Sequence, residues 1–246
     1  MFRAFCRRLI TEPALDYVAA LDAMRGRGVA GLVLACVAFA LAWFAYVPIH
    51  ELFHAWGCLL AGGEVTRLEI SPEYGGALLA RMFPYVVSGS DYAGQLTGFD
   101  THGSDAIYLA TVLAPFLLTV IVGVPMLKRA ARAMSAPGWR PLLLGASIPL
   151  AYAPFVSVLG DYYETGSILV SRAAQWLDPA LPVKRWRGDD VFRLVRELSD
   201  AGAGVFDWIG VGVSLFAGIV LALLTYHVGA RWASILARRY IPGDPK

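Results

Sequence analysis

Four long apolar runs alternate along the chain with shorter polar stretches. Each run is nearly free of charged side chains, and together they cover residues 29–43, 106–127, 141–160 and 205–228. Apolar runs of about 18 or more residues are typical of helices that cross a membrane. The pattern therefore predicts an α-helical integral membrane protein with about four to five transmembrane helices.

The first run belongs to a longer apolar stretch, residues 28–63, in which Glu51 is the only charged residue. A helix of this length would measure roughly 54 Å at about 1.5 Å per residue. A bilayer core is only about 30 Å thick. The helix is therefore expected either to overshoot the core or to break, and Pro48 is the natural place for a kink.

The pattern becomes polar over residues 64–105. Within it, residues 65–81 place apolar and polar side chains in imperfect alternation on either side of a Gly75-Gly76 pair. This arrangement predicts two short strands joined by a turn. Residues 88–105 are rich in Gly, Ser, Asp and Thr and are expected to form a loop.

The polar stretches also divide the chain into units. Basic residues interleaved with apolar ones near the amino terminus suit a helix on the membrane surface, and residues 189–200 have the pattern of an amphipathic helix. The expected units are a basic amphipathic segment (1–27), a membrane core (28–177, with helices 28–63, 106–127 and 141–160 and the strand pair 65–81), an interfacial amphipathic segment (178–204), and a transmembrane helix with a basic tail (205–246).

Composition supports a membrane protein. Hydrophobic residues make up 57% of the chain and the mean hydropathy is +0.57, whereas charged residues make up only 16%. A soluble domain would carry nearer a quarter of charged residues. The net charge of +2 gives no sign of a nucleic-acid partner, and the three cysteines match no zinc or disulfide framework. We expect a multi-pass protein of a prokaryotic cytoplasmic membrane.

The basic residues predict an orientation in that membrane. If residues 28–63 cross once, 13 of the 21 Lys and Arg residues lie on the side of the amino terminus. Cytoplasmic loops carry an excess of such residues, so the amino terminus is expected in the cytoplasm. Two crossings of this stretch, with a break at Pro48, are the alternative.

Residues 50–54 read His-Glu-Leu-Phe-His inside the first apolar stretch. Residues four apart share a helix face, so His50 and His54 present two imidazoles to one point, as a zinc site requires. Glu51 can reach a water held by such a metal, which lowers the pKa of the water to about 7. A chance match has odds on the order of one in 500. A zinc site is therefore favoured over polar side chains that merely face water at the membrane interface.

Zinc needs a third protein ligand. Asp161 follows a helical hairpin that goes out and back, so it should return to about the depth of His54. Glu164 is the fallback ligand, and a solvated acidic residue at a helix end is the alternative interpretation of Asp161. His102 lies in a predicted loop, and His227, in the last helix, is more typical of a packed or hydrogen-bonded histidine.

The order of these features resembles the site-2 protease family of intramembrane zinc metalloproteases, over roughly residues 28–170. An apolar helix enters HELFH, EVTRLEISPEYGG resembles the family's strand pair with its glycine turn, and YAPFVSVLGDYYETG resembles the segment that holds the family's aspartate. The resemblance implies that His50, His54 and Asp161 bind Zn²⁺ and that Glu51 is the general base. The chain would be a divergent, minimal member without a PDZ-like or sensor domain.

The leading hypothesis is a zinc metalloendopeptidase that cuts transmembrane or membrane-adjacent segments of membrane-embedded proteins. A helix hides its peptide carbonyls, so the strand pair 65–81 could hold an extended substrate as an added strand. The residues expected to bind substrate in this way are Leu68, Ile70, Gly75 and Gly76. The bilayer itself and a regulatory membrane protein are the other partners considered.

Two other classes of protein stay open. Where the family carries Gly-Pro followed by Asn, this chain has Ala114-Pro115 and no asparagine, and its aspartate lies in Gly-Asp-Tyr instead of Leu-Asp-Gly. These departures favour a non-catalytic metal-binding relative that acts as a scaffold or regulator, unless Thr111 or Thr119 replaces the asparagine. A transporter with two carboxylates on an ion path is the third class. The chain lacks two repeated halves with paired broken helices, which counts against it.

Overall fold

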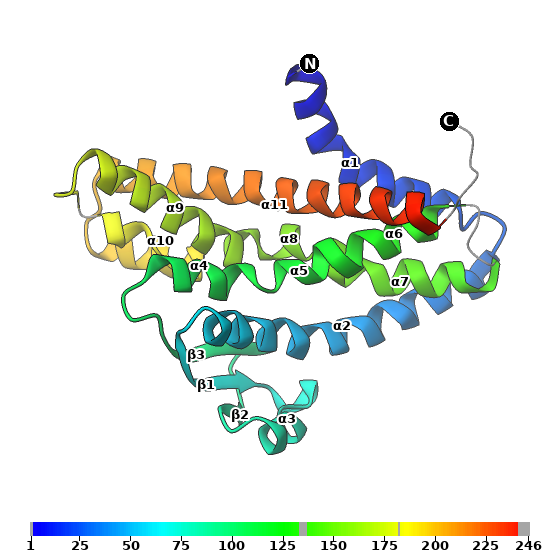
Figure 1. Ribbon diagram of the computed structural model, residues 1–246, viewed down its shortest axis with the longest axis horizontal. Helices are drawn as coiled ribbons and strands as arrows, with labels where there is room; N and C mark the ends of the chain where they lie inside the picture. Colours follow the sequence, from blue (N-terminus) through cyan, green and yellow to red (C-terminus); the bar gives the residue numbers. More distant parts are fainter. Residues whose placement is uncertain (1, 133–136, 182, 241–246) are drawn as a thin grey trace.

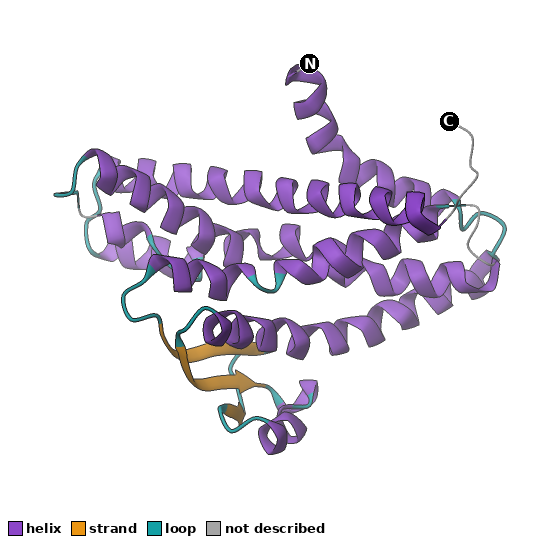
Figure 2. Ribbon diagram, in the orientation of Figure 1, coloured by secondary structure: helices purple, strands orange, loops and turns teal. Residues whose placement is uncertain are grey.

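The computed structural model describes residues 2–132, 137–181 and 183–240. Helices make up most of the fold, and the strands form one small sheet beside the helix bundle (Figures 1 and 2). Two helices are long and apolar enough to cross a membrane, α2 (Gly28–Leu60) and α11 (Val205–Tyr240). They run in opposite directions along the bundle (Figure 1). Within the described residues, two bent helix pairs raise the number of candidate spans to as many as four.

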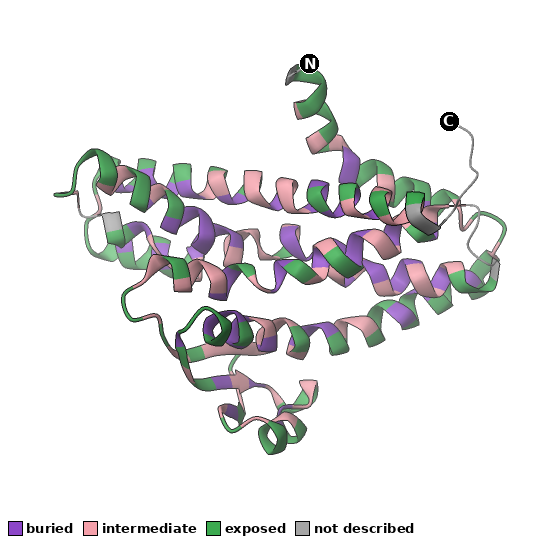
Figure 3. Ribbon diagram, viewed as in Figure 1, coloured by how far each residue is buried: buried purple, intermediate pink, exposed green. Residues whose placement is uncertain are grey.

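The first long helix, α2, is continuous through Pro48. The predicted helix 28–63 is therefore confirmed to within three residues, and the alternative of a break at Pro48 is not seen. Exposed positions recur along its whole length (Figure 3). Many of them are large apolar side chains, such as Val29, Leu32 and Leu41, which water solvates poorly. This surface is compatible with a helix that faces lipid.

The two middle apolar runs form bent pairs of helices. In the first, α4 (Asp105–Leu113) meets α5 (Phe116–Leu118), a π-helical turn (Thr119–Gly123) and α6 (Val124–Ala131) at 41°. In the second, α7 (Arg140–Ala151) meets α8 (Ala153–Val156) and a 3-10 turn (Ser157–Leu159) at 42°. The prediction of unbroken helices over 106–127 and 141–160 is therefore wrong. Each break adjoins a proline, Pro115 or Pro154, which has no N–H to continue the helix.

The sheet has three strands in the order β2-β1-β3. The central strand β1 (Glu64–Ile70) pairs in parallel with β2 (Val86–Ser88) and antiparallel with β3 (Gly94–Asp100). Leu68 and Ile70 of β1 pack against Leu52 and Ala55 of α2. The helix that carries HELFH therefore also carries the sheet.

The predicted strand pair over 65–81 is correct only in its first half. After β1 the chain forms a 3-10 turn (Pro72–Tyr74) and the helix α3 (Gly76–Met82). The residues of GALLARM, apart from its glycine, are good helix formers, and Gly75 takes a left-handed φ of 83° between the turn and the helix. The predicted loop 88–105 contains β3 instead. Its two glycines weaken any strand pattern, and it is pairing with β1 that makes it a strand.

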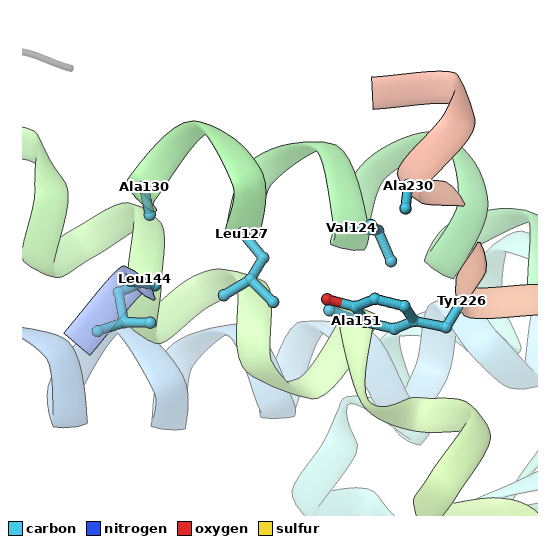
Figure 4. Close-up of a cluster of buried hydrophobic side chains, with 8 residues drawn as sticks. Val124, Leu127, Ala130, Leu144, Ala151, Tyr226 and Ala230 are labelled. Carbon is cyan, nitrogen blue, oxygen red and sulfur yellow. The ribbon is translucent and has the colours of Figure 1, made fainter. Parts of the chain in front are cut away.

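The remaining long helices pack against the bent pairs. The core between α6, α7 and α11 contains Val124, Leu127, Leu144 and Tyr226 (Figure 4). The predicted helices near the amino terminus and over 189–200 are present as α1 (Phe2–Asp22) and α10 (Val191–Asp200). A long helix, α9 (Asp161–Leu177), packs against α11, and a 3-10 turn (Val183–Trp186) leads towards α10.

Candidate metal centre

His50 and His54 lie one turn apart on α2 and present their rings on the same face. The ring centroids are 4.8 Å apart with the rings nearly perpendicular, and the two Nε2 atoms are 3.1 Å apart. His54 is buried and His50 is partly buried. The spacing of HELFH therefore brings the two imidazole nitrogens to one point, as the helical period requires.

Asp161 places its carboxylate beside both imidazoles. Its Oδ2 lies 3.2 Å from His50 Nε2, and its Oδ1 lies 3.6 Å from His54 Nε2. The expectation that this residue lies beside His54 agrees with these distances. Asp161 does not end a helix, because it is the first residue of α9 and the chain continues as a helix beyond it. The break before Asp161 is what turns its side chain into the bundle.

Glu51 completes the group. One ligand atom from each of His50, Glu51 and His54 lies within 4.8 Å of the others, so these three side chains could hold a metal ion. The Glu51 side chain runs against the backbone of β3. A Cβ built on Gly94 would lie 2.6 Å from Glu51 Cγ, which is closer than real Cβ contacts allow. Only glycine at this position leaves the carboxylate where it is.

The outer nitrogens of both rings have hydrogen-bond partners. The Nδ1 atom of His54 lies 2.9 Å from the carbonyl oxygen of Thr111, and His50 Nδ1 lies 2.7 Å from the hydroxyl of Tyr46. A carbonyl oxygen can only accept, so Nδ1 of His54 carries a proton, and this assignment follows from the partner. The lone pair of the neutral ring is then on Nε2, which faces the centre. A ring nitrogen held in this way is the usual support of a metal-binding histidine.

The donor atoms that converge suit a divalent metal ion. The two Nε2 atoms lie 3.1 Å apart with the Asp161 carboxylate beside them, and a cation bound between these three groups would hold their ligand atoms together. Imidazole nitrogen and carboxylate oxygen are ligands of zinc, although other first-row metals also accept them. The residues present therefore fit a zinc ion, and their chemistry alone does not distinguish zinc from its neighbours in the series.

A cleft of about 670 Å³ opens beside these side chains, and Glu51, His54 and Asp161 contribute to its wall. Two segments far apart in sequence form other parts of the wall. One is β3, through Gly94, Gln95, Leu96 and Phe99, and the other covers residues 187–190 together with 192 and 193. The Gln95 Nε2 amide donates to Asp189 Oδ2 at 3.2 Å, which joins the two segments across the cleft.

The four residues expected to bind substrate do not line this cleft. Leu68 and Ile70 are fully buried against α2, and β1 is the central strand, so β1 has no free edge to which a substrate strand could be added. Gly75 and Gly76 lie at the start of α3. The edge strand beside Glu51 is β3. Its glycines made this segment look like a loop in the sequence.

Glu164, the fallback ligand, is buried in the cleft wall one turn after Asp161. Burial raises the pKa of Glu164 to about 7, although the hydrogen bond donated by the Tyr108 hydroxyl acts in the opposite direction. The hydroxyls expected to replace the missing asparagine are engaged elsewhere. Thr111 donates to the carbonyl of Ile107, and Thr119 donates to the carbonyl of Leu150.

The two other histidines lie outside this group. His102 is exposed, and its backbone N–H and its ring both lie beside Asp100 in the same turn. His227 is buried, and its Nδ1 lies 2.8 Å from a carboxylate oxygen of Glu12. The expectation that His227 is a packed or hydrogen-bonded histidine is therefore confirmed.

Two supporting residues were hidden in the sequence to different degrees. Tyr46 lies four residues before His50, so the helical period was enough to place it on the same face. The Thr111 carbonyl has no side-chain signature, because any residue supplies the same oxygen.

Comparison of the chain with protein-family models, with curated proteins and with solved structures finds no match.

Proposed function

We propose that this chain is an intramembrane zinc metalloendopeptidase, a divergent relative of the site-2 proteases. The observation that carries the proposal is the convergence of His50 Nε2, His54 Nε2 and the Asp161 carboxylate beside Glu51, at the wall of a cleft. Three protein ligands with one open position are the arrangement of catalytic zinc sites. Two to four helices are long and apolar enough to cross a membrane, which supports the intramembrane part of the proposal.

Glu51 is assigned the role of general base. A bound zinc ion would supply Lewis acidity, which makes water a nucleophile near neutral pH. Glu51 lies within 4.8 Å of both histidine ligand atoms, and its carboxylate takes the proton that the attacking water loses. The close fit between Gly94 and Glu51 Cγ holds the carboxylate in the position for that transfer.

The strand β3 is assigned the role of substrate platform. It is one of the two edge strands of the sheet in the described part of the chain, and Gly94, Gln95, Leu96 and Phe99 line the cleft. An extended peptide can add to such an edge through main-chain hydrogen bonds, which fixes its carbonyls in place. The substrate class is therefore a transmembrane or membrane-adjacent segment that has unwound locally.

The proposal is tested with detergent-purified full-length protein and its Glu51→Gln variant. The wild type should contain about one zinc per chain by mass spectrometry and should cleave some members of a panel of transmembrane peptides. Glu51→Gln keeps both histidines, so it should keep the zinc and lose cleavage, because a carboxamide cannot take the proton. Wild-type protein without bound metal, or cleavage by Glu51→Gln at the wild-type rate, would contradict the proposal.

A non-catalytic metal-binding scaffold is the second candidate. It is favoured by the lack of asparagine in the chain and by the engagement of both Thr111 and Thr119 with backbone carbonyls. Neither hydroxyl is then a donor for a substrate carbonyl. The same experiment separates the two candidates, because a scaffold would contain zinc and leave every peptide intact.

A further inference from the structure

The break between α4 and α5 leaves one backbone carbonyl without its usual helical partner. In an α-helix the carbonyl of residue i accepts from the N–H of residue i+4. For Thr111 that residue is Pro115, which has no N–H. The neighbouring amide of Ala114 donates to Ala110. The Thr111 oxygen is therefore free to accept a hydrogen bond from another helix.

His54 supplies that hydrogen bond. Its Nδ1 lies 2.9 Å from the Thr111 oxygen, across the contact between α2 and α4. The two helices come this close because Gly57 has no side chain. A Cβ at Gly57 would lie 2.5 Å from the carbonyl oxygen of Ala110. The Thr111 carbonyl that α4 leaves unpaired therefore lies within hydrogen-bond distance of the His54 ring on α2.

The second bent pair repeats this arrangement without a histidine. Leu150 would pair with residue 154, which is Pro154, and its oxygen accepts the Thr119 hydroxyl at 2.7 Å. In both pairs a proline withholds an amide and a side chain from another element takes the carbonyl. The two cases differ in their donor. At Leu150 the donor is a neutral hydroxyl, whereas at Thr111 it is the ring that faces the candidate metal centre.

We propose that Pro115 is a positioning residue for the metal centre. By withholding its amide, it reserves the Thr111 carbonyl for His54, which holds the ring with a proton on Nδ1 and the Nε2 lone pair towards Asp161. This inference rests on the proposed metal centre and adds to it a residue that does not line the cleft. Outer partners of metal-binding histidines commonly change metal affinity by about 10- to 100-fold.

The test compares Pro115→Ala with Pro154→Ala in the purified full-length protein. Both prolines are buried at a helix break, so the two variants share any general cost of restoring an amide. Zinc affinity is measured by competition with a chromophoric chelator. Pro115→Ala should weaken zinc binding by about 10- to 100-fold, because the new amide competes for the Thr111 carbonyl. Pro154→Ala should bind zinc as the wild type does.

A second measurement does not depend on how either variant folds. Nitrogen NMR of metal-free wild-type protein with labelled histidine reports which nitrogen of His54 carries the proton. The expected result is a proton on Nδ1. A proton on Nε2, or equal zinc affinity in Pro115→Ala and the wild type, would overturn the inference and leave the metal centre standing. Wild-type protein that binds no zinc would instead overturn the proposed function, and this inference with it.

Discussion

Two groups of buried or partly buried histidine and carboxylate side chains occur in the described part of the chain, and they differ in where the histidine nitrogens point. One is the candidate metal centre, in which two Nε2 atoms and a carboxylate face one another. The other, here termed the ion-pair cluster, consists of Glu12, Asp16, Lys128 and His227 and joins α1 to α6 and α11. The same residue types therefore point their ligand atoms at one another in the candidate metal centre, and pair with groups of opposite charge in the ion-pair cluster.

Every ionisable group of the ion-pair cluster faces a partner of the opposite kind. His227 Nδ1 lies 2.8 Å from Glu12, and its Nε2 accepts from Arg231 Nε at 3.3 Å. The Lys128 ammonium lies 3.3 Å from Glu12 and 2.8 Å from Asp16. Burial alone would raise the pKa of Glu12, but the hydrogen bond with His227 and the charge of Lys128 outweigh it and lower that pKa. The way the ring nitrogens point, and not the residue type, separates the candidate metal centre from a structural network.

The largest expected effect compares the two carboxylates. Asp161→Ala should lose both bound zinc and cleavage, because two histidines are fewer protein ligands than catalytic zinc sites use. Glu12→Ala should keep its zinc, because no atom of the ion-pair cluster belongs to the centre. Zinc is measured by mass spectrometry on purified variants, with Glu164→Ala as a control that should lose far less. Full zinc occupancy in Asp161→Ala would remove this residue from the ligands.

The next effect is on stability. Glu12→Ala leaves His227 without its carboxylate and Lys128 with Asp16 alone, and breaking a buried pair in this way costs about 3–5 kcal/mol. The free energy of unfolding is measured by denaturant titration followed by circular dichroism, in metal-free protein. A loss well below 1 kcal/mol would mean that water reaches the ion-pair cluster, and the comparison with the metal centre would then fail.

A substitution in β3 should affect catalysis alone. Gly94→Ala places a methyl group against Glu51 Cγ and displaces the carboxylate, and a shift of about 1 Å at a catalytic group can cost 10²-fold in rate. Zinc content should be unchanged. Gly212→Ala is the matched control, because a Cβ there meets no other atom within 4 Å. Equal cleavage rates in the two variants would show that Glu51 is not held by β3.

The smallest effect comes from removing one phenol oxygen in each group. Tyr46→Phe deletes the partner of His50 Nδ1, and zinc affinity should fall by about tenfold. Tyr226→Phe deletes a hydrogen bond to Asp16, and the free energy of unfolding should fall by about 1 kcal/mol with zinc affinity unchanged. Zinc affinity is measured by chelator competition and the free energy of unfolding by denaturant titration, on both variants. A loss of zinc affinity in Tyr226→Phe, or unchanged zinc affinity in Tyr46→Phe, would contradict the comparison.

The parts of the centre that could be predicted from sequence are those that depend on local spacing. His50, Glu51 and His54 occupy one stretch of one helix, so the helical period alone brings the two imidazoles together. Asp161 could be selected because an acidic residue follows an apolar run and the hairpin before it returns. Its exact setting, at the start of a helix, depends on the backbone at Gly160, which separates the 3-10 turn from α9 and has no signature in the apolar pattern.

Other parts could not be predicted because their signal lies in the backbone or in tertiary pairing. The strand β3 looks like a loop, since Gly94 and Gly98 weaken its pattern, and the reason for Gly94 is a side chain on another element. The helix α3 was hidden by partial alternation around Gly75. The role of the Thr111 carbonyl follows from a missing amide, which leaves no trace in hydrophobic periodicity.

The joining of α2 and α9 at one point also has a topological consequence. His54 and Asp161 are about a hundred residues apart in the chain, and an ion bound to both would act as a removable cross-link that closes this long loop. Closing a loop of that size restricts the unfolded chain much as a disulfide does, so part of the binding free energy becomes resistance to unfolding. Removal of the ion by a chelator would then weaken the contact between α2, which packs against the sheet, and the rest of the bundle, before any peptide is cut.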